Sequence, residues 1–423
     1  MLEAAIRDGA LGPGDPLPSV RELAAAAAVS PATAAAALAV LRRRGMIVTR
    51  ERRRSFISPR PPLGVAAAVA TIPAGVRDLA SGHPDPALLP DLAPVLASLD
   101  AGHRTYDDEP VIAELSELAR ADFADSGVEA ERICLASGAL DGVERVLGAH
   151  LRPGDRVAVE DPCYSSLLDL VRAMGLEPVP VAIDEFGLLP RRLAAVLAAG
   201  LDAVILTPRA QNPTGAALDR ARADELARLL ADHRQLLVIE DDHQGPVAGA
   251  PGLSVVAGRE RWARIRSITK ALGPDIRLAF ITGDEATVSR VDGRLAVGPG
   301  WVSEILQRLV VELMRSKNVR AGLARAARVY ATRREALLTA LANHGVVASG
   351  RSGFNVWIPV LDEAAVVAAL LERDWAVAPG APFRLDAPPA VRATTATLRP
   401  REAAVFADDL AAVLTPAPPR RAA

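Results

Sequence analysis

The feature that most restricts the fold of this chain is a repeated alternation of short apolar runs with helical segments. Seven runs have the length and composition of buried strands: 133–136, 156–159, 179–181, 203–206, 236–239, 265–268 and 278–282. Segments with helical character, such as 142–150, 165–174 and 220–232, separate several of them. This order predicts an α/β fold with a mainly parallel sheet. Ligands of such sheets bind at the carboxyl ends of the strands.

Length and composition narrow the class of protein. A chain of 423 residues is too long for one core, so we expect two or more domains. Half of the residues are hydrophobic and the mean hydropathy is +0.19, which excludes a disordered chain. No apolar run is long enough to span a bilayer, and the first residues do not have the pattern of a signal peptide. Two cysteines could form at most one disulfide bond, which would not stabilise a chain of this length. We therefore expect a cytoplasmic protein with no membrane partner.

The basic residues are distributed in two informative ways. Residues 1–60 hold ten arginines and five acids, whereas the remainder has a formal net charge of −7. This asymmetry predicts that the basic segment binds a polyanion. Of the 49 basic residues only Lys270 and Lys317 are lysines. Where arginine has replaced lysine almost everywhere, a remaining lysine is a candidate for chemistry that needs a nucleophilic amine. Lys317 has no assigned role.

The first sixty residues predict two short helices joined by a tight turn and followed by a hairpin. Ser19 and Glu22 have the spacing of a capping box at the start of one helix, and Ser30 precedes Pro31 at the start of the next, 32–44. The hairpin strands are 46–49 and 55–58. This is the pattern of a winged helix-turn-helix, whose last helix enters the major groove of DNA. The arginines at the wing tip would contact DNA phosphates or the minor groove; they are Arg50, Arg52, Arg53 and Arg54. The alternative is a merely solvated basic face.

The motif around these helices resembles the GntR family of regulators. The resemblance rests on Leu11-x-Pro-Gly-Asp-x-Leu-Pro-Ser-x-Arg-Glu-Leu-Ala, on Val29-Ser30 and on Leu41-x4-Met46. It implies that Arg21 and the start of the helix predicted over 32–44, including Thr33 and the preceding Ser30, contact DNA. The recognition helix departs from the family, because Thr33 is the only polar side chain after Ser30 where the family has arginine and several threonines. Direct base readout is therefore expected to be weak.

The segment 59–75 is rich in proline and has little pattern, so we predict a linker there. It would separate a DNA-binding domain, 1–58, from a larger domain, 76–416, with a smaller C-terminal α/β subdomain over about 320–416.

Chemically distinctive residues follow the predicted strands of the larger domain. A small-residue turn, Ser137, Gly138, Ala139 and Leu140, opens a helix and could hold a phosphate. Tyr164 would lie at the rim of the site, although packing is the alternative role for a single tyrosine there. Asn212 begins an Asn-Pro-Thr-Gly turn after the strand predicted over 203–206. The strand over 236–239 is followed by Glu240, Asp241, Asp242 and His243, and the strand over 265–268 is followed by Lys270. A metal site is the rival interpretation of the acids and His243; no second cluster at ligand spacing supports it, so we expect no metal.

Together these residues are the set that pyridoxal 5'-phosphate (PLP) requires: a lysine for a Schiff base, a carboxylate for the pyridine nitrogen and groups for the phosphate. The segment from about 76 to 416 resembles the fold-type I, class I/II aminotransferases. The resemblance rests on Ser137-Gly-Ala, Asn212-Pro-Thr-Gly, Glu240-Asp-Asp and Ser267-x-x-Lys270-x6-Arg277, in the order of the family.

The resemblance implies a role for each residue. Lys270 would form the Schiff base, Asp241 would pair with the pyridine nitrogen, Asn212 would bind the ring oxygen and Tyr164 would stack on the ring. Phosphate would be bound by Ser267, Arg277 and the turn Ser137, Gly138, Ala139 and Leu140. Tyr106 resembles the tyrosine that reaches the phosphate of a neighbouring subunit, which implies a homodimer. Arg392 lies where the family binds the substrate carboxylate. His243 stands where the family has a tyrosine that donates a hydrogen bond to the ring oxygen of PLP. An imidazole could donate the same bond, but its protonation would depend on pH near neutrality. The alternative is a histidine that merely ends the strand and has no role toward PLP.

A GntR-type head joined to an aminotransferase-like body resembles the MocR subfamily of regulators. That resemblance implies a PLP-binding transcriptional regulator that binds double-stranded operator DNA in response to PLP or to an amino-compound effector that forms an aldimine. The alternatives are an active aminotransferase with a vestigial head, and a sensor of PLP supply. The sequence does not reveal the effector, the operator or the direction of regulation.

Overall fold

This computed structural model describes residues 5, 11, 12, 14–43, 46–50, 54–58, 72–100 and 102–415. The chain divides into two compact units, with residues 1–71 in one and most of the remaining residues in the other. The wing-tip residues Arg52 and Arg53, and residues 59–71 of the predicted linker, lie outside the described residues.

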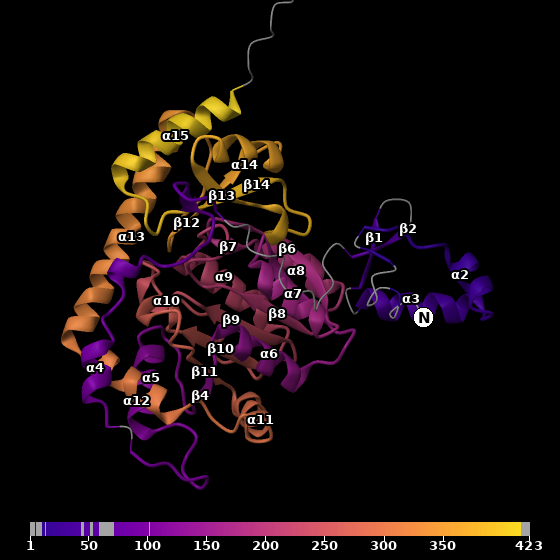
Figure 1. Cartoon of the computed structure of the whole chain (residues 1–423). Coiled ribbons are helices and arrows are strands. Elements are labelled where there is room, and N and C mark those ends of the chain that lie inside the picture. Colours follow the sequence, from indigo (N-terminus) through magenta and orange to yellow (C-terminus); the bar gives the residue numbers. More distant parts are fainter. Residues whose placement is uncertain are drawn as a thin grey trace, which may run out of the picture. The chain divides into compact units, whose positions relative to one another are not determined.

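The N-terminal head is a winged helix-turn-helix. Its elements are α2 (Val20–Ala26), α3 (Pro31–Arg43), β1 (Ile47–Arg50) and β2 (Arg54–Ile57) (Figure 1). The predicted capping box is present: Ser19 Oγ accepts from the N–H of Glu22, and a Glu22 carboxylate oxygen accepts from the N–H of Ser19. The two strands pair in antiparallel register, with Arg50 opposite Arg54. The head has its own small core, made of Leu17, Leu23, Ala24, Ala34, Leu38, Leu41, Ile47 and Ile57.

An eight-stranded sheet forms the centre of the larger domain, in the order β4-β11-β10-β9-β8-β5-β6-β7. Its strands are β4 (Cys134–Ala136), β5 (Arg156–Asp161), β6 (Glu177–Asp184), β7 (Gly187–Leu188), β8 (Ala203–Leu206), β9 (Leu237–Asp242), β10 (Trp262–Ser267) and β11 (Ala279–Gly283). The seven predicted strands are all present. The pairs β8·β9 and β9·β10 are parallel, whereas β11 runs antiparallel to β10 and to β4.

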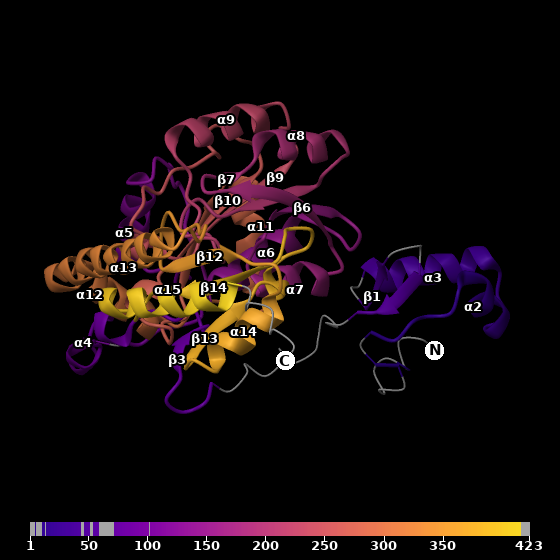
Figure 2. The same ribbon diagram turned by 90° about the horizontal axis from the view of Figure 1, so that it is seen from above.

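Helices cover both faces of this sheet (Figure 2). α8 (Pro190–Ala198) and α9 (Arg220–Ala231) pack on one face through a core that includes Val204, Leu206 and Val238. α6 (Ala139–His150) lies on the other face, where Gly142 approaches Ile265 and Ile281. Because side chains alternate along a strand, successive residues at a strand end face opposite layers.

A second, smaller sheet has the order β12-β14-β13-β3. Its strands are β3 (Arg77–Leu79), β12 (Asn355–Pro359), β13 (Trp375–Pro379) and β14 (Ala390–Thr394). β3 pairs in parallel with β13, so residues 77–79 add a strand to a sheet that is otherwise C-terminal. The long helix α13 (Lys317–Asn343) packs against α15 (Pro400–Leu414) beside this sheet (Figure 1).

The remaining helices are α4 (Ala93–Ser98), α5 (Ala113–Ala124), α7 (Ser165–Ala173), α10 (Thr269–Leu272), α11 (Glu285–Ala296), α12 (Glu304–Arg315) and α14 (Glu363–Leu371). The described residues also form three short 3-10 turns: η1 (Pro86–Leu88), η2 (Gly245–Val247) and η3 (Ala381–Phe383). Within the described residues, no single helix is long and apolar enough to cross a membrane, and α2 and α3 pass that test only as a pair bent by 109°.

Candidate cofactor site

The predicted phosphate turn lies between β4 and α6. Ala139 and Leu140 are the first two residues of α6, so their N–H groups have no acceptor within the helix. Arg277 Nη2 donates to the main-chain oxygen of Ser137 at 3.0 Å. Gly138 has φ +111°, and a Cβ there would lie 2.4 Å from Arg277 Nη2. The turn therefore needs glycine to admit the guanidinium, which joins the positive end of the helix dipole.

Ser267 comes to the same edge of the sheet through strand register. Ala136 pairs with Ala279, and Ala279 pairs with Ser267, so the ends of β4, β11 and β10 are adjacent. Ser267 Oγ donates to Thr269 Oγ1 at 3.0 Å and accepts from the N–H of Thr269. These bonds fix the turn that leads from β10 to Lys270.

Lys270 lies on α10 and is largely enclosed. Its Nζ donates to the main-chain oxygen of Gly82 at 2.8 Å and lies 5.8 Å from the centre of the Phe354 ring. Burial, together with the positive charge of Arg392, lowers the pKa of Lys270 to about 8. A larger share of the side chain is therefore the neutral, nucleophilic amine at neutral pH than in an exposed lysine.

Asp241 is the acid of β9 that faces the α6 layer. It is 7% exposed, and its Oδ1 has no hydrogen-bond partner among the described residues. Burial and the neighbouring acids Asp242 and Glu160 raise its pKa to about 7. A buried carboxyl with an unused oxygen is suited to a cationic N–H, which would restore the charged form.

The other two acids of Glu240-Asp-Asp point to the opposite layer, where they belong to a buried ion-pair cluster. Arg264 Nη1 donates to Glu240 Oε2 at 2.8 Å, and Arg209 and Arg266 both pair with Asp242. Burial alone would raise the pKa of Asp242, but Arg266, Arg209 and Arg264 together hold it below its usual range. These two acids are therefore structural. Within the described residues, no group of three His, Cys, Asp or Glu side chains could hold a metal ion.

His243 is the first residue after β9 and follows Asp242. Burial and the charge of Lys270 lower the pKa of His243 to about 4. The expectation from the sequence that His243 titrates near neutral pH is therefore wrong: the imidazole is neutral there. A neutral imidazole still carries one N–H and can donate one hydrogen bond.

Asn212 and Arg392 converge from different layers of the domain. Arg392 Nη1 donates to Asn212 Oδ1 at 3.1 Å, and Arg392 Nη2 donates to the main-chain oxygen of Ala80. Asn355 Nδ2 also donates to Asn212 Oδ1, at 3.3 Å. Burial lowers the pKa of Arg392 to about 10, although Tyr164 and Asp78 oppose this shift.

The two predicted tyrosines differ in exposure. Tyr164 follows β5 and is 39% exposed, as expected of a ring at the rim of a site. Tyr106 is 91% exposed and makes an edge contact with Trp301, with ring centres 5.7 Å apart.

These residues fit PLP. Asp241 has an unused buried oxygen for the pyridine nitrogen, the Gly138 turn admits the Arg277 guanidinium beside the start of α6, and Lys270 is a largely buried amine of lowered pKa. Three contributors were missed from the sequence: Gly82, Phe354 and Asn355. No motif marks them, because they approach the site only when the chain folds.

Three of the predicted DNA-binding residues, Arg21, Ser30 and Thr33, are exposed on the head. Arg21 lies on α2. Ser30 Oγ accepts from the N–H of Thr33 and lies 2.8 Å from Thr33 Oγ1, so these hydroxyls also cap α3. The backbones of Arg50 and Arg54 lie at the turn ends of the two hairpin strands.

The fold and site define a winged helix-turn-helix fused to a PLP-binding body of the fold-type I aminotransferase class. Two family models agree: "Bacterial regulatory proteins, gntR family" matches residues 1–57, and "Aminotransferase class I and II" matches residues 76–410.

Similar proteins include a vitamin B6 salvage pathway transcriptional repressor, PtsJ of Salmonella typhimurium. It is 38% identical over 406 residues, which cover 95% of this chain and 94% of that protein. The pyridoxine biosynthesis regulator PdxR of Corynebacterium glutamicum is 31% identical and covers 55% of this chain and 53% of that protein. The chain belongs to the MocR-type regulators of the GntR family.

Solved structures share the fold of the body. The α-aminoadipate aminotransferase LysN of Thermus thermophilus, complexed with N-(5'-phosphopyridoxyl)-L-leucine, is 25% identical with a TM-score of 0.70, and covers 81% of this chain and 92% of that chain. A multiple substrate aminotransferase of Thermococcus profundus has a TM-score of 0.74 at 18% identity, and covers 84% of this chain and 96% of that chain.

Proposed function

We propose that this protein binds operator DNA through its winged head, and that PLP or an amino-compound effector at Lys270 modulates the binding. One observation carries the proposal: a capped helix-turn-helix and the pair Lys270 and Asp241 occur in one chain. When bound, PLP supplies an aldehyde that condenses with a primary amine, either that of Lys270 or that of an effector.

The residues of the chain have separate tasks toward this ligand. Asp241 holds a proton on the pyridine nitrogen, the Gly138 turn and Arg277 bind the phosphate, and Arg392 binds a carboxylate of the effector. Lys270 would hold the cofactor through its side-chain amine. The lowered pKa of Lys270 leaves more of this amine neutral near pH 7.

The regulatory step is a shift between two arrangements of head and body. A ligand that binds one closure of the body more tightly shifts the population toward it. The segment 59–75 would then carry the two heads of a homodimer to a different spacing. Because half-sites on DNA have a fixed separation, a change in spacing is a change in affinity.

An exposed apolar surface supports the homodimer. Tyr106 is 91% exposed beside Trp301, and Arg104 lies 4.5 Å from the centre of the Trp301 ring. Val297 and Ile305, from the same part of the chain as Trp301, are 89% and 53% exposed. Large apolar side chains exposed at neighbouring positions of the chain are candidates for a surface that a partner covers.

PLP itself is the first effector to examine. PtsJ is named for repression in the vitamin B6 salvage pathway and PdxR for pyridoxine biosynthesis. A regulator of this kind would respond to the end product of the pathway that it controls. The target genes proposed here are therefore those of B6 supply.

The test is DNA binding by the full chain, measured by fluorescence anisotropy on the DNA upstream of its own gene, with and without PLP. We expect PLP to change the affinity of the wild type and of Lys317→Ala, and to have no effect on Lys270→Ala. Equal responses of all three proteins would contradict a role for Lys270. Turnover of an amino donor without DNA binding would identify the protein as an aminotransferase instead.

A further inference from the structure

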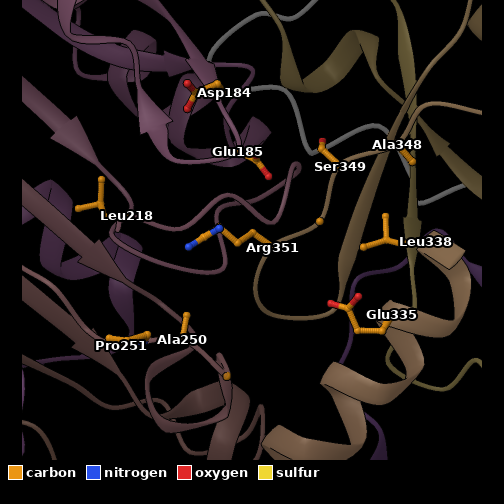
Figure 3. A pocket seen from close by; sticks show the side chains of 12 residues that line it. Asp184, Glu185, Leu218, Ala250, Pro251, Glu335, Leu338, Ala348, Ser349 and Arg351 are labelled. Atoms are coloured by element: carbon orange, nitrogen blue, oxygen red, sulfur yellow. The ribbon is translucent and has the colours of Figure 1, made fainter. Parts of the chain in front are cut away.

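A pocket of about 780 Å³ lies in the body, and neither Lys270 nor Asp241 lines it. Its walls come from two regions (Figure 3). One includes Glu185 and Leu218, and the other includes Glu335 and Leu338 of α13 and the loop that carries Arg351.

The charges in this pocket are of both signs and are weakly paired. Within the described part of the chain, no ion pair is formed by Arg351, whose guanidinium lies 4.5 Å from the centre of the Phe186 ring. Glu335 is paired only with its neighbour Arg334, at 3.4 Å, and its side chain is 64% exposed. Asp184, which also lines the pocket, is already held by Arg222 through two bonds of 2.8 and 2.9 Å.

Figure 3 shows Arg351 reaching into the pocket from its loop and Glu335 turned toward it from α13. Leu218 and Leu338 also line the pocket and give it apolar surface. A ligand with an ammonium at one end, a carboxylate at the other and a short apolar middle would pair with both Glu335 and Arg351 and contact the leucines. A simple anion would meet Glu335 and Glu185, and a simple cation would meet Arg351.

The wall of this pocket is also bonded to the cofactor site. The N–H groups of Arg351 and Ser352 both donate to the main-chain oxygen of Gly215, at 3.0 and 2.8 Å. Gly215 closes the Asn212-Pro-Thr-Gly turn, and a Cβ on Gly215 would lie 2.7 Å from the main-chain oxygen of Asn355. Asn355 in turn donates to Asn212 Oδ1. Such close backbone packing transmits a displacement of the loop to the turn.

We propose that this pocket is a second, non-covalent ligand site for a small zwitterionic amino compound, with Glu335 binding the ammonium and Arg351 the carboxylate. Occupation of the pocket acts on the cofactor site through the contact of the 351–352 loop with Gly215. This site is separate from Lys270 and goes beyond the proposed function, because it needs no chemistry of the cofactor.

The probe is 6-(dimethylamino)hexanoate, a zwitterion that cannot condense with an aldehyde because its nitrogen is tertiary. Titration calorimetry on the full chain without PLP measures its affinity directly. We expect saturable binding that weakens at least about tenfold in Arg351→Gln and in Glu335→Gln, since each loses a charge-assisted bond. Arg325→Gln, an exposed position on the same helix as Glu335, should bind as the wild type does.

Three results would overturn the site. The first is no binding of the probe up to about 10 mM, and the second is that both variants bind the probe as tightly as the wild type does. The third is that hexanoate and N,N-dimethylhexylamine, which each carry only one of the two charges, bind the wild type as tightly as the probe does. The coupling is tested on the PLP-loaded protein, where the probe should shift the visible band in the wild type and in Arg325→Gln but not in Arg351→Gln. An unmoved band in all proteins would refute the coupling. The calorimetry needs no PLP, so it still tests the pocket if the proposed function fails.

Discussion

Arg392 Nη1 donates a hydrogen bond to Asn212 Oδ1 at 3.1 Å, although 180 residues separate them in the chain. One residue lies in the small sheet and the other in the turn after β8. The bond brings the residue expected to bind a carboxylate to the residue expected to bind the ring oxygen. A movement of the small sheet would therefore displace Asn212, the residue proposed to bind the ring oxygen.

Arg392→Gln should raise the pKa of Lys270 from about 8 toward its ordinary value, because it removes a nearby positive charge. The labelling rate of Lys270 by PLP, trapped with cyanoborohydride and followed by mass spectrometry, should then need a higher pH to reach its half-maximum. Arg325→Gln is the matched control and should leave the profile in place. A profile that does not move in Arg392→Gln would show that burial alone sets this pKa.

Asp241→Asn should change how the stability of the PLP-free protein depends on pH. The folded-state pKa of about 7 lies above the ordinary 3.8, so the folded carboxyl keeps a proton that the unfolded one releases. The contribution of Asp241 to stability is present below about pH 4 and is lost as pH rises toward 7. Above pH 7 the variant should be more stable than the wild type by about 1–3 kcal/mol.

Chemical denaturation between pH 4 and 8 measures this effect, with the exposed Glu117→Gln as control. Asp241→Asn should also bind PLP more weakly than the wild type does, because a neutral amide cannot stabilise the protonated pyridine nitrogen by charge. Parallel pH profiles for wild type and Asp241→Asn would contradict the buried, unpaired state of this carboxyl.

Gly138→Ala should weaken PLP binding at least about tenfold, since its Cβ would lie 2.4 Å from Arg277 Nη2 and its φ of +111° disfavours any side chain. The strain should also lower the free energy of unfolding by about 1–3 kcal/mol. Gly322→Ala is the matched control, because a Cβ there meets nothing within 4 Å. Fluorescence titration with PLP and denaturant melts give both quantities, and unchanged PLP affinity would remove this turn from the site.

Replacement of Arg52, Arg53 and Arg54 by alanine should weaken DNA binding and reduce its dependence on salt. Each arginine that neutralises a phosphate contributes about 0.9 to the slope of log affinity against log salt, so the slope should fall by about 2 to 3. Anisotropy titrations between about 50 and 200 mM salt measure it. An unchanged slope would mean that the wing arginines only face solvent, and Arg325→Gln on the body controls for overall charge.

The sequence by itself determined the elements of the fold. The runs at 203–206 and 278–282 became β8 (Ala203–Leu206) and β11 (Ala279–Gly283), and the Ser19 capping box formed as predicted. Local patterns carry this information, because hydrophobic period and cap chemistry act over a few residues. The scarcity of lysine likewise distinguishes Lys270 and Lys317 among the basic residues, and the motif around Lys270 separates it from Lys317.

Only the tertiary structure decided what surrounds these residues. It separated Asp241 from Glu240 and Asp242 by placing them in opposite layers, and it lowered the pKa of His243 to about 4 through burial and Lys270. It also brought Gly82 to Lys270 across 188 residues of chain. Burial and long-range charge depend on which segments meet in space, and no spacing along the chain records that.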